Sequence, residues 1–432
     1  MSKNTFYISA PFDTYSGYGA RSRDLIKAII ELDQYDVKLI SQRWGNTPWG
    51  FIKNNPEWEF LTKYLYLQPQ LTEQPDIWMQ ITVPNEFQPV GKFNIGCTAG
   101  METTLVDGSW VEGINRMDVN LVSSEHSKQS FLNSVFQKID KGQSLGDVKV
   151  EKPIEVLFEG ADTNIYKVID LLPKNELYNT INSIPESFAY LFVGHWMQGD
   201  LGQDRKNVGL LIKAFFELFK NKTKKPALIL KTSGAGSSYM DRNEILKKIE
   251  IIKKTINSNN LPNIYLLHGE FTDLEMNQLY NHPKVKAMVS LTKGEGYGRP
   301  LLEFSLTKKP IITSGWSGHI DFLNPEFTTL LPGKLENVHD SAVVPNMILK
   351  EGQWFSPDHG TIGHFLKDVY ENYKSYKEKA NRQAYISRSN FNWDKMKDKT
   401  NQLFTQYIPD LPKKVEIKLP NLKKIELPKK PV

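Results

Sequence analysis

Short apolar runs rich in β-branched and aromatic residues recur along the first third of the chain. The segments between them carry apolar residues every three to four positions, which is the spacing of an amphipathic helix. Strands separated by helices of about ten residues indicate crossover connections and a mostly parallel sheet. The expected strands are residues 5–9, 36–41, 76–83, 94–99 and 119–124, and the expected helices are residues 21–32 and 125–136.

A second series with the same alternation begins near residue 188. Its expected strands are residues 188–194, 226–233, 263–269, 285–291 and 310–315, and its expected helices are residues 206–219, 240–256, 273–283 and 300–306. The polar segment 169–187, with two prolines, reads as the connection between the two series. Helices are also expected at residues 359–389 and 391–407. The pattern predicts two doubly wound α/β domains, whose ligands would bind beyond the carboxyl ends of the strands, between the domains.

Length and composition agree with two folded domains. The chain has 432 residues, with 40% hydrophobic and 24% charged residues, values that are ordinary for globular proteins. The single cysteine, Cys97, excludes an internal disulfide and suits a reducing compartment. No apolar run approaches the length of a membrane span, and the N-terminus lacks the pattern of a signal peptide. We therefore expect a cytoplasmic protein.

The positive charge is concentrated at the C-terminus. The last 22 residues contain seven Lys and two Glu, which accounts for the whole formal excess of +5. The nearly neutral remainder argues against a surface that coats nucleic acid. We expect the tail to be a solvated linker, with contact to a membrane surface or a protein partner as the alternative.

The segment KGEGYGRPLLEFSL, Lys293–Leu306, follows a run expected to be a buried strand. Gly294, Gly296 and Gly298 allow positive φ and a close approach of the backbone to a ligand. Pro300 suits the first position of a helix, whose N-terminus would attract a phosphate or diphosphate. The segment therefore predicts an anion site at the edge of the second sheet.

Two glutamates flank this glycine-rich stretch. Glu303 lies in the first turn of the expected helix, where a carboxylate is favoured and can accept two hydrogen bonds from a diol such as ribose. Glu295 lies on the loop and would face another part of the same ligand. For Glu303 alone, a helix-capping role is the alternative; the whole cluster favours a functional site.

The stretch EGYGRPLLE, residues 295–303, resembles the paired-glutamate motif of retaining nucleotide-sugar glycosyltransferases of the GT-B fold, the family four group, also called glycosyl transferases group 1. The resemblance extends over roughly residues 5–408. It implies an α/β GT-B architecture, in which two Rossmann-like doubly wound domains face a central cleft and a C-terminal helix crosses back to the first domain. The implied parts are an acceptor-side domain, 1–168, a nucleotide-sugar-binding domain, 169–385, the crossover helix, 386–408, and the basic tail, 409–432.

Other segments resemble the family in the same order. Residues 16–29 resemble its glycine loop, residues 101–104 its acceptor side, and residues 192–215 the stretch whose basic pair binds the donor diphosphate. The resemblance therefore assigns catalysis to Glu295, Arg205 and Lys206; donor binding to Gly17, Gly19, His195, Gly296, Tyr297, Gly298, Arg299, Pro300, Leu301 and Glu303; and the acceptor side to Glu102 and Thr103. The alternative for the basic pair is a solvated loop.

The chain departs from the family at two of these positions. Many relatives carry Arg where this chain has His195, and Glu102 is the nearest polar counterpart of a histidine often found on the acceptor loop. Both departures concern direct ligand contacts, one to the donor diphosphate and one to the acceptor.

The resemblance implies transfer of a hexose-type sugar from a UDP- or GDP-sugar to an acceptor hydroxyl with retention of configuration. Neither Asp-x-Asp nor HExxH occurs, so we expect metal-independent chemistry and no cofactor. A carbohydrate, a lipid-linked sugar and other hydroxyl compounds stay open as acceptors. The aromatic-rich segment Arg43–Phe60 would form either an acceptor platform or a packed loop.

The sequence agrees less well with several other functions. A glycoside hydrolase also needs two carboxylates, but it does not need an anion site beside them. A serine hydrolase would need a G-x-S-x-G elbow, which the chain lacks. Two rivals remain: a transferase acting on nucleic-acid bases, against which the neutral body counts, and a non-catalytic module that binds nucleotide or glycan.

Overall fold

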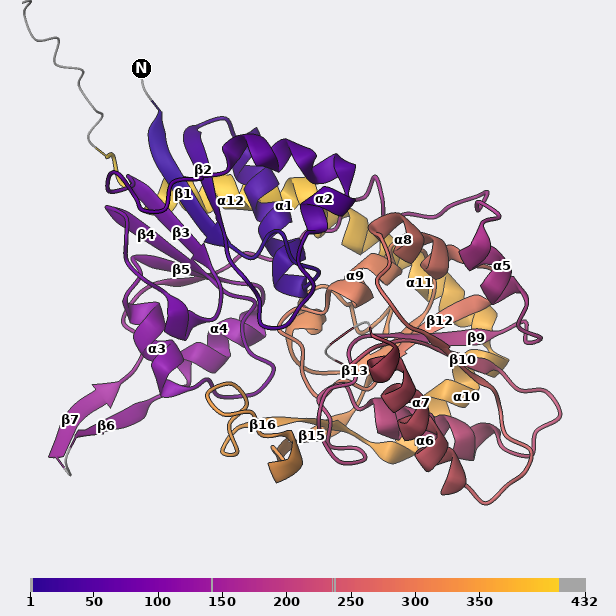
Figure 1. The fold of residues 1–432 in the computed structure, drawn as a ribbon. Coiled ribbons are helices and arrows are strands. Elements are labelled where there is room, and N and C mark those ends of the chain that lie inside the picture. The colour runs from indigo at the N-terminus through magenta and orange to yellow at the C-terminus, as the bar shows by residue number, and fades with distance from the viewer. Residues whose placement is uncertain (1–2, 141–142, 235, 237, 412–432) are drawn as a thin grey trace, which may run out of the picture.

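The computed structural model describes residues 3–140, 143–234, 236 and 238–411. Figure 1 shows two α/β domains, one formed by the N-terminal third of the chain and one by most of the remainder. Most of the basic tail predicted at residues 409–432 lies outside the described residues. Among the described helices, none has the length and apolarity that crossing a bilayer requires.

The first domain contains a parallel sheet of six strands in the order β2-β1-β3-β4-β5-β8. Its central strands carry continuous apolar runs because helices cover both faces of a parallel sheet. The strands are β1 Asn4–Ala10, β2 Tyr35–Ser41, β3 Ile77–Ile81, β4 Phe93–Cys97, β5 Val119–Val122 and β8 Ile154–Val156. The helices of this domain are α1 Gly17–Glu31, α2 Phe51–Asn54, α3 Gly108–Asn115 and α4 Glu125–Leu132, with 3₁₀ helices at Pro56–Tyr64 and Pro84–Glu86.

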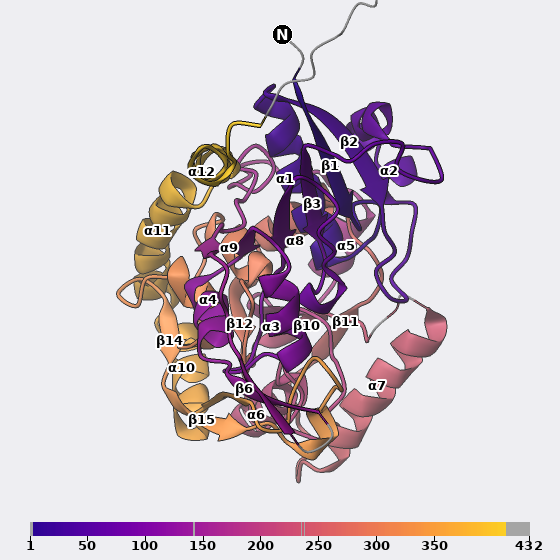
Figure 2. The same cartoon turned by 90° about the vertical axis from the view of Figure 1, so that its left-hand side faces the viewer.

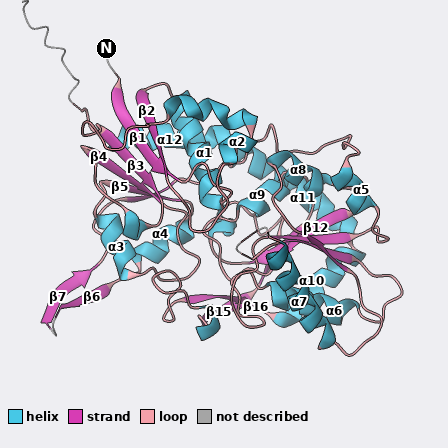
Figure 3. Ribbon diagram, viewed as in Figure 1, coloured by secondary structure: helices cyan, strands magenta, loops and turns pink. Residues whose placement is uncertain are grey.

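The second domain repeats this arrangement with six parallel strands in the order β11-β10-β9-β12-β13-β14. The strands are β9 Ala189–Val193, β10 Ala227–Lys231, β11 Ile264–Leu267, β12 Val285–Ser290, β13 Ile311–Ser314 and β14 Thr329–Leu331. The helices that connect them are α6 Val208–Phe219, α7 Tyr239–Lys254, α8 Asp273–Asn281 and α9 Arg299–Ser305, with 3₁₀ helices at Gly318–Asp321 and Asp340–Ala342. Figure 3 shows the two sheets as separate layers, each covered by helices. The two doubly wound domains expected from the sequence are therefore present.

Several short elements differ from the expected pattern. The segment read as a connection contains α5, Glu176–Asn182, whose N-cap Asn175 accepts a hydrogen bond from the amide of Tyr178 at 3.0 Å. The helix expected to reach residue 136 ends at Leu132, and two hairpins without expected strands are present. They are β6 Phe136–Asp140 with β7 Gln143–Val148, and β15 Gly333–Asn337 with β16 Gln353–Pro357. These strands are no longer than six residues, and short two-stranded units are hard to recognise from a sequence pattern.

The C-terminal helices return to the first domain. The helix expected at 359–389 is divided at Asn372 into α10 His359–Glu371 and α11 Tyr373–Asn390, and α12 follows at Trp393–Tyr407. Figure 2 shows the three helices running along one side of the molecule from the second domain to the first. The apolar face of α12 joins the core of the first domain, and Trp393 donates a hydrogen bond to the carbonyl of Asp24 at 3.3 Å. The crossover of the last helix is thus confirmed, although residue 386, its expected start, lies within α11.

Candidate functional site

The loop after β12 lies against the first domain. A Cβ on Gly294 would lie 1.9 Å from the carbonyl oxygen of Glu102, and a Cβ on Gly296 would lie 2.6 Å from that of Ala99. The carbonyl of Gly296 accepts a hydrogen bond from the hydroxyl of Ser124 at 2.6 Å. Only residues without a side chain fit this approach, so the glycines place the loop in direct contact with the first domain.

The helix after this loop begins one residue earlier than expected. Gly298 is its N-cap with a φ of 98°, Arg299 is its first residue and Pro300 its second. The left-handed conformation of Gly298 allows the helix to start directly after it. Glu303 is therefore the fifth residue of α9 and lies beyond the first turn, so the expectation that it lies within that turn was wrong.

Glu295 lies in a buried network of charges that spans both domains. Its carboxylate pairs with the ammonium of Lys206, and its second oxygen lies 3.7 Å from Nη1 of Arg205. The same Nη1 lies 3.1 Å from Oε1 of Glu102 in the first domain. Two cations thus face two carboxylates at the domain boundary.

Burial and charge act in opposite directions on the groups of this network. Burial alone would raise the pKa of Glu295, but Lys206 and Arg205 outweigh it and hold that pKa below its ordinary value. Burial lowers the pKa of Lys206, and the attraction of Glu295 offsets only part of that effect. Glu295 is therefore ionised at neutral pH.

The basic pair is positioned by the start of α6. Asn207 is the N-cap of this helix and has a φ of 56°, and the amide of Val208 donates to the carboxylate of Asp204 at 3.1 Å. The amide of Lys293 donates to the carbonyl of Arg205 at 2.7 Å, which ties the segment to the loop that carries Glu295. The predicted solvated-loop alternative does not describe Lys206, because that residue is only 9% exposed.

A second network joins the domains through Arg299. Its Nη1 lies 2.6 Å from Oδ2 of Asp24 on α1, and its Nε lies 2.7 Å from Oε1 of Glu303. The hydroxyl of Tyr280 donates to the other oxygen of Glu303 at 3.4 Å. Asp24 had no sequence signal as a site residue, because it lies far from Arg299 along the chain.

Glu303 is buried, and desolvation raises its pKa to about 7. Arg299 opposes this shift, but Arg299 is shared with the carboxylate of Asp24, and the nearby Asp273 adds to the negative charge. Burial, together with one cation shared among several acids, explains why the carboxyl of Glu303 holds a proton up to nearly neutral pH.

The other predicted donor residues occupy different surroundings. A Cβ on Gly19 would lie 2.3 Å from the carbonyl of Thr14, whereas no atom lies within 4 Å of a Cβ on Gly17. Tyr297 and Leu301 are both 3% exposed and belong to the core of the second domain. His195 is exposed, and its Nδ1 lies 3.0 Å from the hydroxyl of Ser233.

The two acceptor-side residues serve different purposes. Glu102 pairs with Arg205 as described. Thr103 is fully buried, and its hydroxyl donates to the carbonyl of Leu105 at 2.8 Å. Thr103 therefore holds the shape of the loop, while the side chain of Glu102 reaches the second domain.

His319 was not singled out from the sequence, although its segment, residues 313–323, contains the glycines of a tight loop. Its ring is fully buried, its Nε2 donates to the carbonyl of Ser314 at 2.7 Å, and a Cβ on Gly298 would lie 3.0 Å from its Cβ. Burial lowers the pKa of His319, and the charge of Glu295 opposes this. The imidazole thus lies directly behind the loop that carries Glu295.

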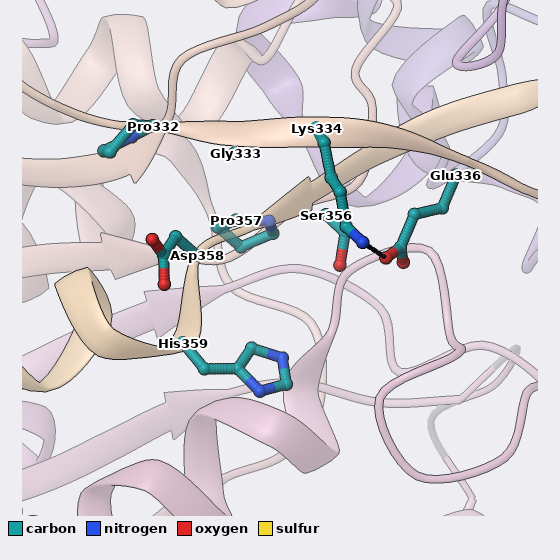
Figure 4. Close-up of a pocket in the computed structure, with 8 residues that line it drawn as sticks. All are labelled: Pro332, Gly333, Lys334, Glu336, Ser356, Pro357, Asp358 and His359. Atoms are coloured by element: carbon teal, nitrogen blue, oxygen red, sulfur yellow. Dashed lines mark ion pairs between the residues drawn. The ribbon is translucent and has the colours of Figure 1, made fainter.

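A cavity of about 570 Å³ lies elsewhere in the second domain. Figure 4 shows its walls, formed by the β15–β16 hairpin and the start of α10, with Lys334 and Glu336 paired at 3.2 Å. None of the predicted site residues lines it. The part of the chain that the structure describes contains no group of three or more His, Cys, Asp or Glu residues able to hold a metal ion, and metal independence stays a prediction.

Comparison with solved structures identifies the architecture. A glycosyltransferase from Rickettsia africae matches over 95% of this chain and 100% of its own, with a TM-score of 0.59 and 15% identity. The Anabaena protein HepE, solved with UDP and glucose, matches over 93% of this chain and 100% of its own (TM-score 0.58, 11% identity). Sucrose-phosphate synthase from Thermosynechococcus elongatus matches over 94% and 99% (TM-score 0.60, 10% identity). The chain has the GT-B fold. No protein-family model and no curated protein sequence matches it.

The two charge networks lie where the two domains of the GT-B fold meet. Glu102 and Asp24 come from the first domain, and Arg205, Lys206, Glu295, Arg299 and Glu303 come from the second. The fold thus brings together residues from four separate chain segments. The expected GT-B architecture is confirmed.

Proposed function

We propose that this protein is a glycosyltransferase that moves a hexose-type sugar from a UDP- or GDP-sugar to an acceptor hydroxyl, without a metal ion and with retention of configuration. The observation that carries the proposal is the convergence of Arg205 and Lys206 on Glu295 at the boundary between the two GT-B domains.

The two cations suit a nucleoside diphosphate leaving group. Negative charge collects on the diphosphate as the bond to the sugar breaks, and fixed cations stabilise that charge. In the structure, Glu102 and Glu295 neutralise Arg205 and Lys206. A bound diphosphate would therefore replace Glu102 as the partner of Arg205.

The glutamates would hold the sugar and the ribose. Glu295 is ionised, so it can accept hydrogen bonds from hydroxyls of the donor sugar. Glu303 would accept bonds from the ribose once it is ionised. In the proposed step, the bond between the sugar C1 and the diphosphate oxygen breaks, the acceptor oxygen bonds to C1 on the same face, and the departing phosphate takes the acceptor proton.

The comparisons support UDP as the first donor carrier to test. Structures of HepE were solved with UDP-glucose and with UDP, and this protein shares their fold. The cytoplasmic location, and the contact of the tail with a membrane surface or protein partner, belong to the same proposal. Nucleic acid as an acceptor and a purely binding role are outcomes that the experiment below distinguishes.

The deciding experiment is thermal unfolding of the full chain in EDTA with UDP, GDP and ADP separately, on the wild type and on Glu303→Ala. A ligand at 100 times its Kd adds about 2.7 kcal/mol of stability, which is a readily measured shift. We expect one uridine or guanosine nucleotide to raise the Tm, and the shift to shrink in the variant. The matching radiolabelled nucleotide-sugar should then lose its sugar to water or to an acceptor.

Three outcomes would contradict the proposal in different ways. If no nucleotide moves the wild-type Tm, donor binding as described is wrong. If a nucleotide binds but no sugar is ever released, the binding-module rival is correct. If transfer occurs only with duplex DNA and retention on DNA falls steeply with salt, the nucleic-acid rival is correct.

A further inference from the structure

We propose that Trp44 and Trp49 form a subsite for a sugar ring of the acceptor, so that the acceptor is a carbohydrate. The inference rests on the proposed function and names its substrate class. The two indoles lie on the loop between β2 and α2, within the aromatic-rich segment that the sequence singled out.

The loop is held rigidly against the end of β1. The amides of Gly50 and Ile52 donate to the carbonyl and the carboxylate of Asp13 at 3.0 and 2.8 Å, and the amide of Tyr15 donates to the carbonyl of Pro48 at 3.1 Å. Gly50 has a φ of 88°, which few other residues adopt without strain. A platform fixed in advance binds its ligand without a cost for ordering the loop.

The indoles present apolar surface on this rigid loop. Trp44 stacks on Tyr18 with ring centroids 3.9 Å apart and planes inclined by 23°, and it is only half-buried. Trp49 is 45% exposed, and the guanidinium of Arg43 lies 6.0 Å from the centre of its ring. Aromatic area that stays exposed on a loop held in place by hydrogen bonds is available to a ligand.

Direct contacts connect this platform to the loop after β12, which carries Glu295. The hydroxyl of Tyr18 bonds to the hydroxyl of Thr98 at 2.8 Å and accepts a hydrogen bond from the amide of Ala99 at 3.1 Å. The carbonyl of Ala99 in turn lies against Gly296, next to Glu295. Trp44 is therefore connected through Tyr18 to the loop that carries Glu102, on the proposed acceptor side of the domain boundary.

The chemistry of the surface favours a sugar. The face of an aromatic ring carries partial negative charge, which suits the polarised C–H groups on one face of a pyranose. Arg43 and the exposed Asn46 supply hydrogen-bond donors at the rim for ring hydroxyls. A lipid-facing surface would instead combine exposed indoles with several cations, and between Gln42 and Gly50 the loop contains one basic residue.

The test is binding of three probes to the full chain by saturation-transfer NMR: methyl α-D-glucopyranoside, methyl α-D-mannopyranoside and methyl β-D-galactopyranoside. Trp44→Ala and Trp49→Ala are the test variants, and Trp44→Phe keeps an aromatic ring. Tyr385→Ala is the matched control, because Tyr385 is 74% exposed on α11. We expect at least one pyranoside to bind, with an affinity that falls about tenfold in each Trp→Ala variant, equivalent to about 1.4 kcal/mol.

The control and Trp44→Phe should retain binding, and the thermal shift with UDP should be unchanged in every variant. Failure of all three pyranosides to bind the wild type overturns the inference, as does binding that survives both Trp→Ala variants. Retention of the wild type, but not Trp49→Ala, on phosphatidylglycerol vesicles would also overturn it and assign the indoles to a lipid surface. Saccharide binding that depends on the indoles, without any nucleotide effect, would support the sugar site and contradict the transferase.

Discussion

Arg205 of the second domain and Glu102 of the first form an ion pair across the domain boundary, with 3.1 Å between Nη1 and Oε1. Arg205 is also the residue proposed to bind the donor diphosphate, so under that proposal a phosphate oxygen would take the place of the Glu102 carboxylate.

Replacing Glu102 by Gln should strengthen nucleotide binding, because the diphosphate then no longer competes with a carboxylate for the guanidinium of Arg205. Arg205 and Glu102 are partly exposed, so we expect the pair to contribute about 1 kcal/mol and the Kd for UDP to fall about fivefold by isothermal titration. Glu112→Gln is the control, since Glu112 pairs with Lys138 on the outer surface of the same domain. Weaker binding of UDP to Glu102→Gln would show that Glu102 assists the donor and does not compete with it.

Replacing Lys206 by Met should destabilise the fold as well as stop turnover. The change leaves the buried carboxylate of Glu295 with only Arg205, at 3.7 Å, as a cation. Removing one partner of a buried pair costs about 3 kcal/mol, which chemical denaturation can measure. The double variant Glu295→Gln/Lys206→Met should regain most of this loss, and additive losses would refute the coupling of the two residues.

Stability should depend on the protonation of Glu303. Because its folded-state pKa is raised to about 7, the folded protein binds this proton more tightly than the unfolded chain. The stabilisation is fully present below the unfolded pKa and is lost as the pH rises through about 7, a change of about 3 kcal/mol. Denaturation of wild type and Glu303→Gln from pH 4.5 to 8 should show this loss only in the wild type.

Glu326→Gln, which replaces an exposed glutamate of the same domain, should leave the pH profile unchanged. A wild-type stability that stays flat or rises over that range, relative to Glu303→Gln, would contradict the raised pKa.

Replacing Gly296 by Ala should push the loop that carries Glu295 away from the first domain. Its Cβ would overlap the carbonyl of Ala99, a backbone atom that cannot move alone. A displacement of about 1 Å at a reacting group can cost about 100-fold in rate, so we expect a loss of that size in sugar transfer by Gly296→Ala, with both domains still folded. Small-angle scattering should show a larger radius of gyration.

Gly363→Ala on α10 is the control for Gly296→Ala, since its added Cβ has only one neighbour, at 3.9 Å. An active Gly296→Ala enzyme of unchanged size would show that the close contact is not needed for transfer.

The strands and the glycine-rich loop after β12 were predictable because their signals lie in short stretches of sequence. Buried parallel strands such as β12 carry continuous apolar runs, and the glycines at 294, 296 and 298 stand directly after one of them. The start of α9 was misplaced by one residue, because the left-handed conformation of Gly298 is a property of the folded loop. Because α9 begins at Arg299, Glu303 lies beyond the first turn, and its carboxylate pairs with the guanidinium of Arg299.

The sequence by itself determined the two series of strands and helices and the glycine-rich loop that carries Glu295, because periodicity and motif spacing are local properties of the chain; Arg205 and Lys206 became candidates through the family resemblance of their segment. Only the tertiary structure decided that Glu102 meets Arg205 and that Asp24 meets Arg299, since these partners are far apart along the chain and come from different domains. It also decided the protonation of Glu303, because burial and the sharing of one cation between two acids exist only after folding.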